Sequence, residues 1–265
     1  MLALFKGAGR LPELIIEQLA AAGTAPVVCA LDPDDEAQFH VSLPRLGSLL
    51  GILRSRGVTE ICMAGSIDRT TLTLGAPDAA TQPLVPALQA ALGGGDGQAL
   101  AGLHKLLEDQ GFQIRAAQEL CPELLPPEGV LTQAKPTKSH EQDTAKAGAT
   151  LAITGAADLG QGCVVEDGQV VAVECLPGTD AMLASVAAFR AGQGWSQGGV
   201  FMKAPKPGQD LRTDMPTIGP ETAQSVVDAG LAGIVIEAGG VMVLDLDDVI
   251  QSLNAAGAFL WVRAR

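Results

Sequence analysis

One loop, residues 203–219, collects the side chains best suited to handling phosphate. Its charged residues are two lysines, an arginine and two aspartates: Lys203, Lys206, Asp210, Arg212 and Asp214. Lysine and arginine bind phosphate oxygens, whereas aspartate ligates Mg²⁺ or acts as a general base. Three prolines fix backbone dihedrals and remove N–H donors, which makes the loop stiffer than its length suggests. The pattern indicates phosphate chemistry, with a solvated loop of no chemical function as the alternative.

Two elements would position this loop. Residues 199–202 form an apolar run typical of a buried strand, and residues 221–229 have the periodicity of a helix. Loops that follow strands are where α/β proteins hold their ligands, because the ends of several strands meet at one edge of the sheet. We therefore expect the loop to leave a buried strand and to lead into a helix.

The first residues of the chain show the same strand–turn–helix pattern. Strand-like residues 2–5 lead through Gly7-Ala-Gly9 into a helix that reaches Ala22. Glycines allow a tight turn and a close approach of the backbone, and the amides at a helix start can receive a phosphate or carboxylate. The third glycine of the dinucleotide-binding motif is replaced by Pro12, so a strand–helix turn without a dinucleotide is the simpler interpretation.

Further strands and helices alternate along the first half of the chain. Residues 58–64 form a strand-like run that ends at Gly65, with Asp68 close behind. Asp32 follows a second strand-like run, residues 26–31, as an acidic residue does in nucleotide-binding oxidoreductases, which keeps that class of protein as an alternative. The alternation predicts parallel strands joined by right-handed crossovers.

The pattern changes after a proline cluster at residues 121–129, and we place the domain boundary at residue 133. A helix is expected over residues 139–155, with Ser139 as its N-cap. A final strand, residues 259–262, is expected to close the second sheet.

Asp167-Gly168 stands between two valine-rich runs and predicts a β-hairpin over residues 162–174. The outgoing strand of this hairpin delivers Glu174 to the start of the next helix, where Thr179 and Asp180 lie. Ser, Thr and Asp at a helix start often act as caps alone, so capping is the alternative to a functional role.

Composition excludes several classes of protein. The 265 residues carry a net charge of −13, aromatic residues make up 3%, and tyrosine is absent, which argues against a nucleic-acid partner. Five scattered cysteines and three histidines show no metal-binding spacing, so buried reduced thiols are expected and zinc is not. No leader peptide and no membrane-spanning run is expected, which predicts a cytoplasmic protein.

Six motifs in fixed order resemble one family. They are Gly160-Gln-Gly162, Glu174, Gly178-Thr-Asp-Ala-Met182, Lys203-Ala-Pro-Lys-Pro207, Asp214-Met-Pro-Thr-Ile-Gly219 and Ala232-Gly-Ile234. The chain is similar here to the metal-dependent UDP-2,3-diacylglucosamine pyrophosphatases of lipid A biosynthesis that are unrelated to metallophosphoesterases. The glycine turn near residue 7 extends the resemblance to nearly the whole chain.

The resemblance implies an α/β fold with a Rossmann-like parallel-sheet domain over residues 1–133 and a smaller catalytic α/β domain over residues 134–265. It implies hydrolysis of UDP-2,3-diacylglucosamine to UMP and 2,3-diacylglucosamine 1-phosphate, with Mg²⁺ or another divalent cation. The implied catalytic residues are Asp214, Lys203 and Arg212, and the implied metal ligands are Asp214, Asp180 and Glu174. The implied substrate-binding residues are Gly7, Gly9, Gly65, Gln161, Thr179, Lys206 and Thr217.

The resemblance also implies where the protein works. Its substrate is a lipid-linked UDP-sugar, so a cytoplasmic protein peripheral to the inner membrane is expected. The sequence leaves open whether a homodimer forms. A non-catalytic sensor of UDP-sugars is a second alternative, which would bind the nucleotide-sugar without releasing UMP.

Overall fold

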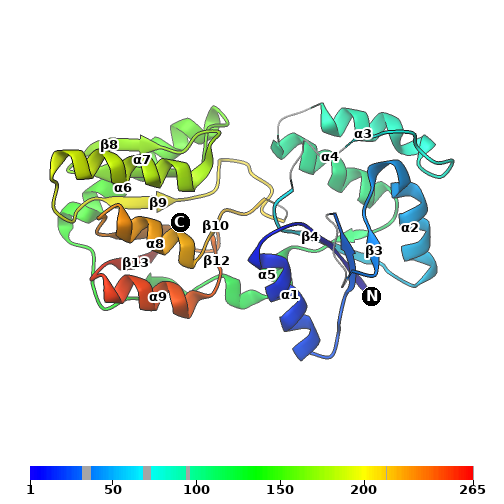
Figure 1. The fold of residues 1–265 in the computed structure, drawn as a ribbon, viewed down its shortest axis with the longest axis horizontal. Coiled ribbons are helices and arrows are strands. Elements are labelled where there is room, and N and C mark those ends of the chain that lie inside the picture. Colours follow the sequence, from blue (N-terminus) through cyan, green and yellow to red (C-terminus); the bar gives the residue numbers. More distant parts are fainter. Residues whose placement is uncertain (32–36, 68–72, 94–95, 213, 265) are drawn as a thin grey trace. The chain divides into compact units, whose positions relative to one another are not determined.

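The chain folds as two compact units in the computed structural model, which describes residues 1–31, 37–67, 73–93, 96–212 and 214–264. One unit comprises Met1–Pro122 and Asp210–Asp214, and the other comprises Glu123–Gln209 and Met215–Arg265 (Figure 1). The units are of comparable length, rather than a larger and a smaller one. The chain therefore leaves the second unit once, contributes a short segment to the first, and returns. The domain boundary at residue 133 stays a prediction.

The N-terminal unit contains a five-stranded sheet in the order β3-β2-β1-β4-β5, and every pair in it is parallel. The strands are β1 (Leu2–Lys6), β2 (Val27–Ala30), β3 (Phe39–His40), β4 (Glu60–Ala64) and β5 (Gln113–Ile114). The helices are α1 (Arg10–Ala21), η1 (Leu43–Arg45), α2 (Leu46–Ser55), η3 (Gln82–Leu84), α3 (Val85–Leu92), α4 (Asp96–Asp109) and α5 (Ala117–Leu120). This order and direction confirm the Rossmann-like parallel sheet.

Alternating burial explains why helices pack on both faces of this sheet. Ala3 and Phe5 of β1 belong to the core that α2, α3 and α4 cover, whereas Leu4 between them points to the opposite face. Helices α1 and α5 pack together, and α5 contacts β4. A strand buried on both faces reads as a continuous apolar run, as residues 2–5 do.

The C-terminal unit has a mixed six-stranded sheet in the order β6-β13-β11-β9-β7-β8. Its strands are β6 (Gly129–Val130), β7 (Gly162–Glu166), β8 (Gln169–Val173), β9 (Val200–Lys203), β11 (Gly233–Glu237) and β13 (Phe259–Arg263). Its helices are η4 (Pro122–Leu124), which begins at the unit boundary, α6 (Lys138–Ala156), α7 (Gly178–Gln193), α8 (Pro220–Asp228) and α9 (Leu246–Ala255). A separate parallel pair joins β10 (Thr217–Ile218) to β12 (Met242–Val243).

Two cores sandwich this second sheet. Phe201, Ile234 and Leu260 face the core formed with α7, α8 and α9, whereas Met202 and Val235 face the smaller core under α6. The expectation that residues 259–262 close the sheet is wrong, because β13 lies between β11 and the short antiparallel strand β6.

The predicted hairpin is present, and a side chain outside it accepts hydrogen bonds from the amides of its turn. Asp167 and Gly168 have φ values of 49° and 75°, as a two-residue hairpin turn requires. The buried Asp143 accepts hydrogen bonds from both of their amides, at 3.1 and 2.7 Å. The cap expected at Ser139 lies instead at Thr137, whose hydroxyl accepts from the amide of His140.

All five cysteines are free thiols, and four of them are buried, which agrees with the expectation of reduced thiols. Burial raises the pKa of Cys29, Cys62 and Cys163 to about 12. Among the helices that the structure describes, none has the length and apolar character needed to cross a membrane.

Candidate functional site

Lys203, Glu174 and Thr179 meet in the C-terminal unit, and we call these three residues the Lys203 cluster. The Lys203 ammonium donates to the Thr179 hydroxyl at 2.5 Å and lies 3.6 Å from Oε2 of Glu174. Lys203 ends strand β9 and only 6% of its surface is exposed. The sequence placed this lysine in a polar loop, whereas the sheet buries it. A buried ammonium needs a carboxylate or a hydrogen-bond acceptor beside it, and Glu174 and Thr179 supply these.

Two glycines make room for Glu174. A β-carbon on Gly160 would clash with the Glu174 carbonyl oxygen, and one on Gly162 would lie 2.7 Å from Glu174 Oε2. The backbones are also joined, since Gly160 N donates to Glu174 O and Glu174 N donates to Gly162 O. The Gly-Gln-Gly motif therefore has a physical reason, which is the close approach of this carboxylate.

Gln161 lies between those glycines and contacts the loop after β9. Its side-chain amide donates to Gln209 Oε1 at 2.7 Å, and the same oxygen accepts from the Lys206 backbone amide at 2.9 Å. The Lys206 ammonium pairs with Asp158 at 2.8 Å. Hydrogen bonding from Lys206 lowers the pKa of Asp158. Gln161 and Lys206 thus belong to one polar network. Lys206 lies three residues after Lys203 of the Lys203 cluster.

The carboxylates predicted as metal ligands come from both units. Asp214 belongs to the N-terminal unit, whereas Glu174 and Asp180 belong to the C-terminal unit. Asp180 is exposed on the first turn of α7, a helix whose N-cap residue is Pro177. Glu174 Oε2 is buried, and none of the described residues forms a hydrogen bond with it. Across the described ranges, no three His, Cys, Asp or Glu side chains converge as a ready metal site.

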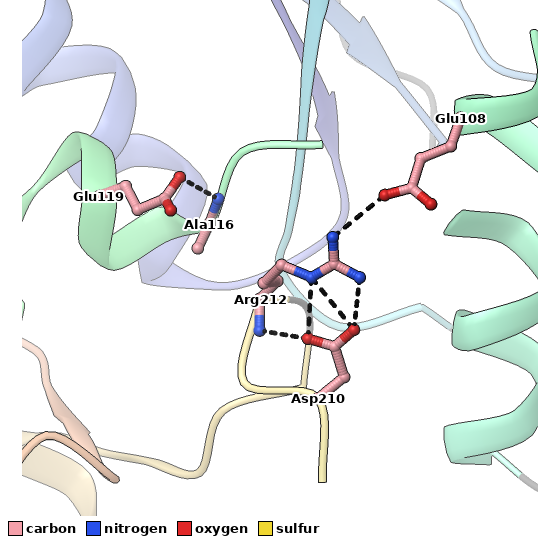
Figure 2. A network of polar contacts seen from close by, with 5 residues as sticks. All are labelled: Glu108, Ala116, Glu119, Asp210 and Arg212. Atoms are coloured by element: carbon pink, nitrogen blue, oxygen red, sulfur yellow. Dashed lines mark hydrogen bonds and ion pairs between the residues drawn. The ribbon is translucent and has the colours of Figure 1, made fainter. Parts of the chain in front are cut away.

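Arg212 lies on a loop segment that belongs to the N-terminal unit, and two carboxylates bind its guanidinium (Figure 2). Its guanidinium donates through Nη1 to Glu108 of α4 at 3.0 Å and through Nη2 to Asp210 at 2.7 Å. These hydrogen bonds raise the pKa of Arg212, and the Arg212 hydrogen bond lowers the pKa of Asp210. Glu108 was not predicted as a partner, because nothing in the sequence links α4 to this loop. Asp210 was not singled out either, although it lies two residues before Arg212 in the same loop.

Gly7 and Gly65 meet at the point where the strand order of the N-terminal sheet reverses. Ala8 and Ser66 exchange backbone hydrogen bonds of 2.9 Å in both directions, and Gly7 N donates to Ala64 O at 2.8 Å. A β-carbon on Gly7 would lie 2.5 Å from Ser66 O. The amides of Gly7, Ala8 and Ser66 are therefore occupied within the protein. Gly9, with φ of 102°, precedes the first residue of α1.

The remaining predicted residues have simpler surroundings. Thr217 begins β10 and its hydroxyl donates to the Met215 carbonyl at 3.1 Å. Asp32 and Asp68 lie outside the described residues. The substrate-binding and metal-binding roles of all these residues stay predictions.

The fold and these clusters define the class: an α/β protein of two units, with a Rossmann-like parallel sheet and a mixed sheet that ends in a buried lysine–glutamate–threonine cluster. Family models for the LpxI N-terminal domain and the LpxI C-terminal domain match residues 1–124 and 127–261. The UDP-2,3-diacylglucosamine pyrophosphatase LpxI of Caulobacter vibrioides is 38% identical over 269 residues, which cover 98% of this chain and 96% of that protein. The chain belongs to the LpxI family.

Proposed function

We propose that this protein is a UDP-2,3-diacylglucosamine pyrophosphatase of lipid A biosynthesis. It adds water across the phosphoanhydride and releases UMP and 2,3-diacylglucosamine 1-phosphate. The observation that carries the proposal is the likeness to the Caulobacter vibrioides pyrophosphatase, which extends over 98% of the chain. Both family models match in the expected order, so neither unit is foreign to that family.

Lys203 has the geometry of a phosphate ligand. An ammonium has three N–H donors, of which Thr179 takes one and Glu174 attracts another. The third is left for a phosphate oxygen, whose developing charge a buried ammonium stabilises better than a solvated one. Glu174 and Thr179 orient the ammonium in this proposal.

Asp214 is proposed to position the attacking water or to ligate the metal. Arg212 was predicted as a second phosphate clamp, and its engagement by Asp210 and Glu108 favours an anchoring role instead. Gln161 and Lys206 are proposed to contact the diphosphate or the uridine through their amide and ammonium groups. Asp180 remains a candidate ligand at the exposed start of α7.

A divalent cation fits part of this set. Mg²⁺ takes one or two carboxylates and keeps several waters, so a cage of three carboxylates is not needed. Asp214 is the first carboxylate proposed as a ligand, and Glu174, whose Oε2 is buried and has no hydrogen-bond partner among the described residues, is proposed as an alternative to it. When bound, such a cation neutralises phosphate charge. Lys203 already faces Glu174, which makes Asp214 the stronger ligand candidate.

The test is release of UMP from UDP-2,3-diacylglucosamine by the purified protein, with and without chelator. We expect activity with Mg²⁺, its loss in excess EDTA, and its return when Mg²⁺ is restored. Full activity in EDTA would remove the cation from the proposal while leaving the reaction in place. Tight binding of the substrate without any UMP release would instead support the sensor.

The substrate carries acyl chains, so the protein is also proposed to work at a membrane surface. Sedimentation with vesicles that contain the lipid product, compared with vesicles that lack it, measures this association. Full recovery of the protein in the supernatant with both kinds of vesicle would contradict it.

A further inference from the structure

The segment Asp210–Asp214 is joined to the N-terminal unit by polar contacts from two separate elements. Glu108 of α4 accepts from Arg212 Nη1 at 3.0 Å. Gln118 of α5 donates from Nε2 to the Leu211 carbonyl at 2.9 Å. We call this segment the strap, and Glu108 and Gln118 its anchors. The anchors hold neighbouring residues of the strap, one by its side chain and one by its backbone.

Contacts within the strap carry this anchoring to Asp214. Asp210 accepts from both the backbone amide and the guanidinium of Arg212, at 3.0 Å for N and for Nε. The Asp214 amide donates to the Asp210 carbonyl at 3.3 Å. Pro216 follows two residues later and restricts the chain on the other side. The backbone of Asp214 is thus tied, through Asp210 and Arg212, to helices α4 and α5.

We propose that Glu108 and Gln118 are positioning residues for Asp214. This inference rests on the proposed function, in which the Asp214 carboxylate acts on water or metal. Displacement of a catalytic group by about 1 Å can cost about 100-fold in rate, so a small loosening of the strap is enough to lower turnover. Neither anchor belongs to the motifs that the sequence relates to the family.

The Glu108 anchor contributes little to global stability, which separates positioning from folding. The side chains of Arg212 and Glu108 are 47% and 43% exposed. Ion pairs of this exposure stabilise a protein by only about 0–1 kcal/mol. Their removal therefore leaves the cores of both units intact, and an effect on turnover would not report unfolding.

Four variants test the inference: Glu108→Ala, Glu108→Gln, Gln118→Ala and Gln118→Glu. Both alanine variants should lower kcat about tenfold or more, with a smaller change in KM and an unchanged melting temperature. A glutamine side chain keeps an acceptor oxygen for Arg212, so Glu108→Gln should recover part of the activity. A glutamate side chain has no N–H to donate to the Leu211 carbonyl, so Gln118→Glu should behave like the alanine variant.

Asp109→Ala is the matched control. Asp109 pairs with Lys105 at 3.1 Å on the same helix as Glu108, also on an exposed surface. This variant should keep the wild-type kcat. Equal losses in Asp109→Ala and Glu108→Ala would overturn the inference, because the effect would then belong to helix α4 in general.

Hydrogen exchange tests whether Glu108 and Gln118 hold the strap in place, without any assay of activity. Amide exchange over residues 210–214 should speed up in Glu108→Ala and Gln118→Ala but not in Asp109→Ala. Unchanged exchange, or faster exchange with an unchanged kcat, would overturn the positioning role. If wild-type protein released no UMP, the proposed function would fail, while the exchange data would still show whether the anchors hold the strap.

Discussion

At the scale of single residues, the Lys203 cluster departs most from what the sequence suggested. A lysine at the start of a proline-rich polar loop reads as a surface residue, yet Lys203 is 6% exposed. Its pairing with Glu174 and Thr179 needs strand β9 to lie beside β7, a non-local contact that no spacing reveals. The types of residue in the loop were enough to indicate phosphate chemistry. The burial of Lys203 depends on tertiary structure and could not be predicted from the sequence.

Removing Lys203 should therefore cost stability as well as binding. Lys203→Ala leaves the largely buried Glu174 carboxylate without its counter-charge, which we expect to destabilise the protein by about 3 kcal/mol. The matched control is Lys206→Ala, whose partner Asp158 is 81% exposed and whose loss should cost about 0.5 kcal/mol or less. Urea unfolding of both variants measures the difference. Equal midpoints for the two would show that Glu174 is well solvated in the native state.

Asp214 should matter for turnover and little for affinity. We expect Asp214→Ala to lower kcat by about 100-fold or more, since an essential charged group is lost, while the uridine and acyl groups still bind. Asp228→Ala, at an exposed helix end, is the control. Single-turnover rates and a binding constant should be measured together. Near-wild-type turnover would exclude Asp214 from the chemistry, and lost binding with normal turnover at saturation would make it a substrate clamp.

At the scale of elements, the long helices and buried strands could be predicted because their own residues carry the periodicity. The helix α2 and the strand β1 follow their apolar patterns within a few residues. The two-residue strands β3, β6 and β10 could not be predicted, because two residues have no period. These short strands exist only because a neighbouring strand offers hydrogen bonds at that point.

Glycines in different elements should respond oppositely to alanine. Gly65 has φ of 96°, and a β-carbon there would lie 2.7 Å from the Ala8 carbonyl oxygen, so Gly65→Ala should destabilise by about 2 kcal/mol. Gly51 lies inside α2 with open space around it, so Gly51→Ala should stabilise by up to about 1 kcal/mol. Thermal unfolding of the two variants compares them. A stable Gly65→Ala protein would mean that the turns after β1 and β4 separate easily.

At the scale of the whole molecule, stability should fall with mild acid because of His104. Both ring nitrogens are buried without a hydrogen-bond partner among the described residues, and burial lowers the pKa of His104. Asp210 and Glu108 nearby favour the charged form and Arg212 disfavours it. Below about pH 6.5 the unfolded chain binds a proton at this histidine before the folded protein does, so stability is lost as pH falls.

Replacing His104 should reduce the loss of stability between neutral and mildly acidic pH. We expect His104→Leu to lose less stability than the wild type between about pH 7 and pH 5, since leucine neither titrates nor leaves polar atoms unsatisfied. His40→Gln is the control, because His40 is exposed. Denaturant midpoints at both pH values supply the comparison. If His104→Leu lost as much stability between these pH values as the wild type does, the pH dependence of stability would belong to other titratable groups.

The division into units could be predicted only in outline. The alternation of strands and helices indicated parallel strands in the first half of the chain, and the family resemblance implied a C-terminal α/β domain; both are present. The strap could not be predicted, because its anchors Glu108 and Gln118 lie about a hundred residues earlier, at separations of 104 and 93 positions. The prolines of the loop predicted its stiffness from the sequence. The helices α4 and α5 that contact the strap could not be predicted in the same way.

The path of the strap limits how the gene for this protein can be recombined with that of a relative. A cut at residue 122 yields a continuous N-terminal fragment, but it leaves Asp210–Asp214 encoded with the other half. A hybrid that joins the first 122 residues of one relative to the remainder of another would place a foreign strap on α4 and α5. Exchange of the N-terminal unit therefore has to carry codons 210–214 along with the first 122, as two separate blocks inherited together.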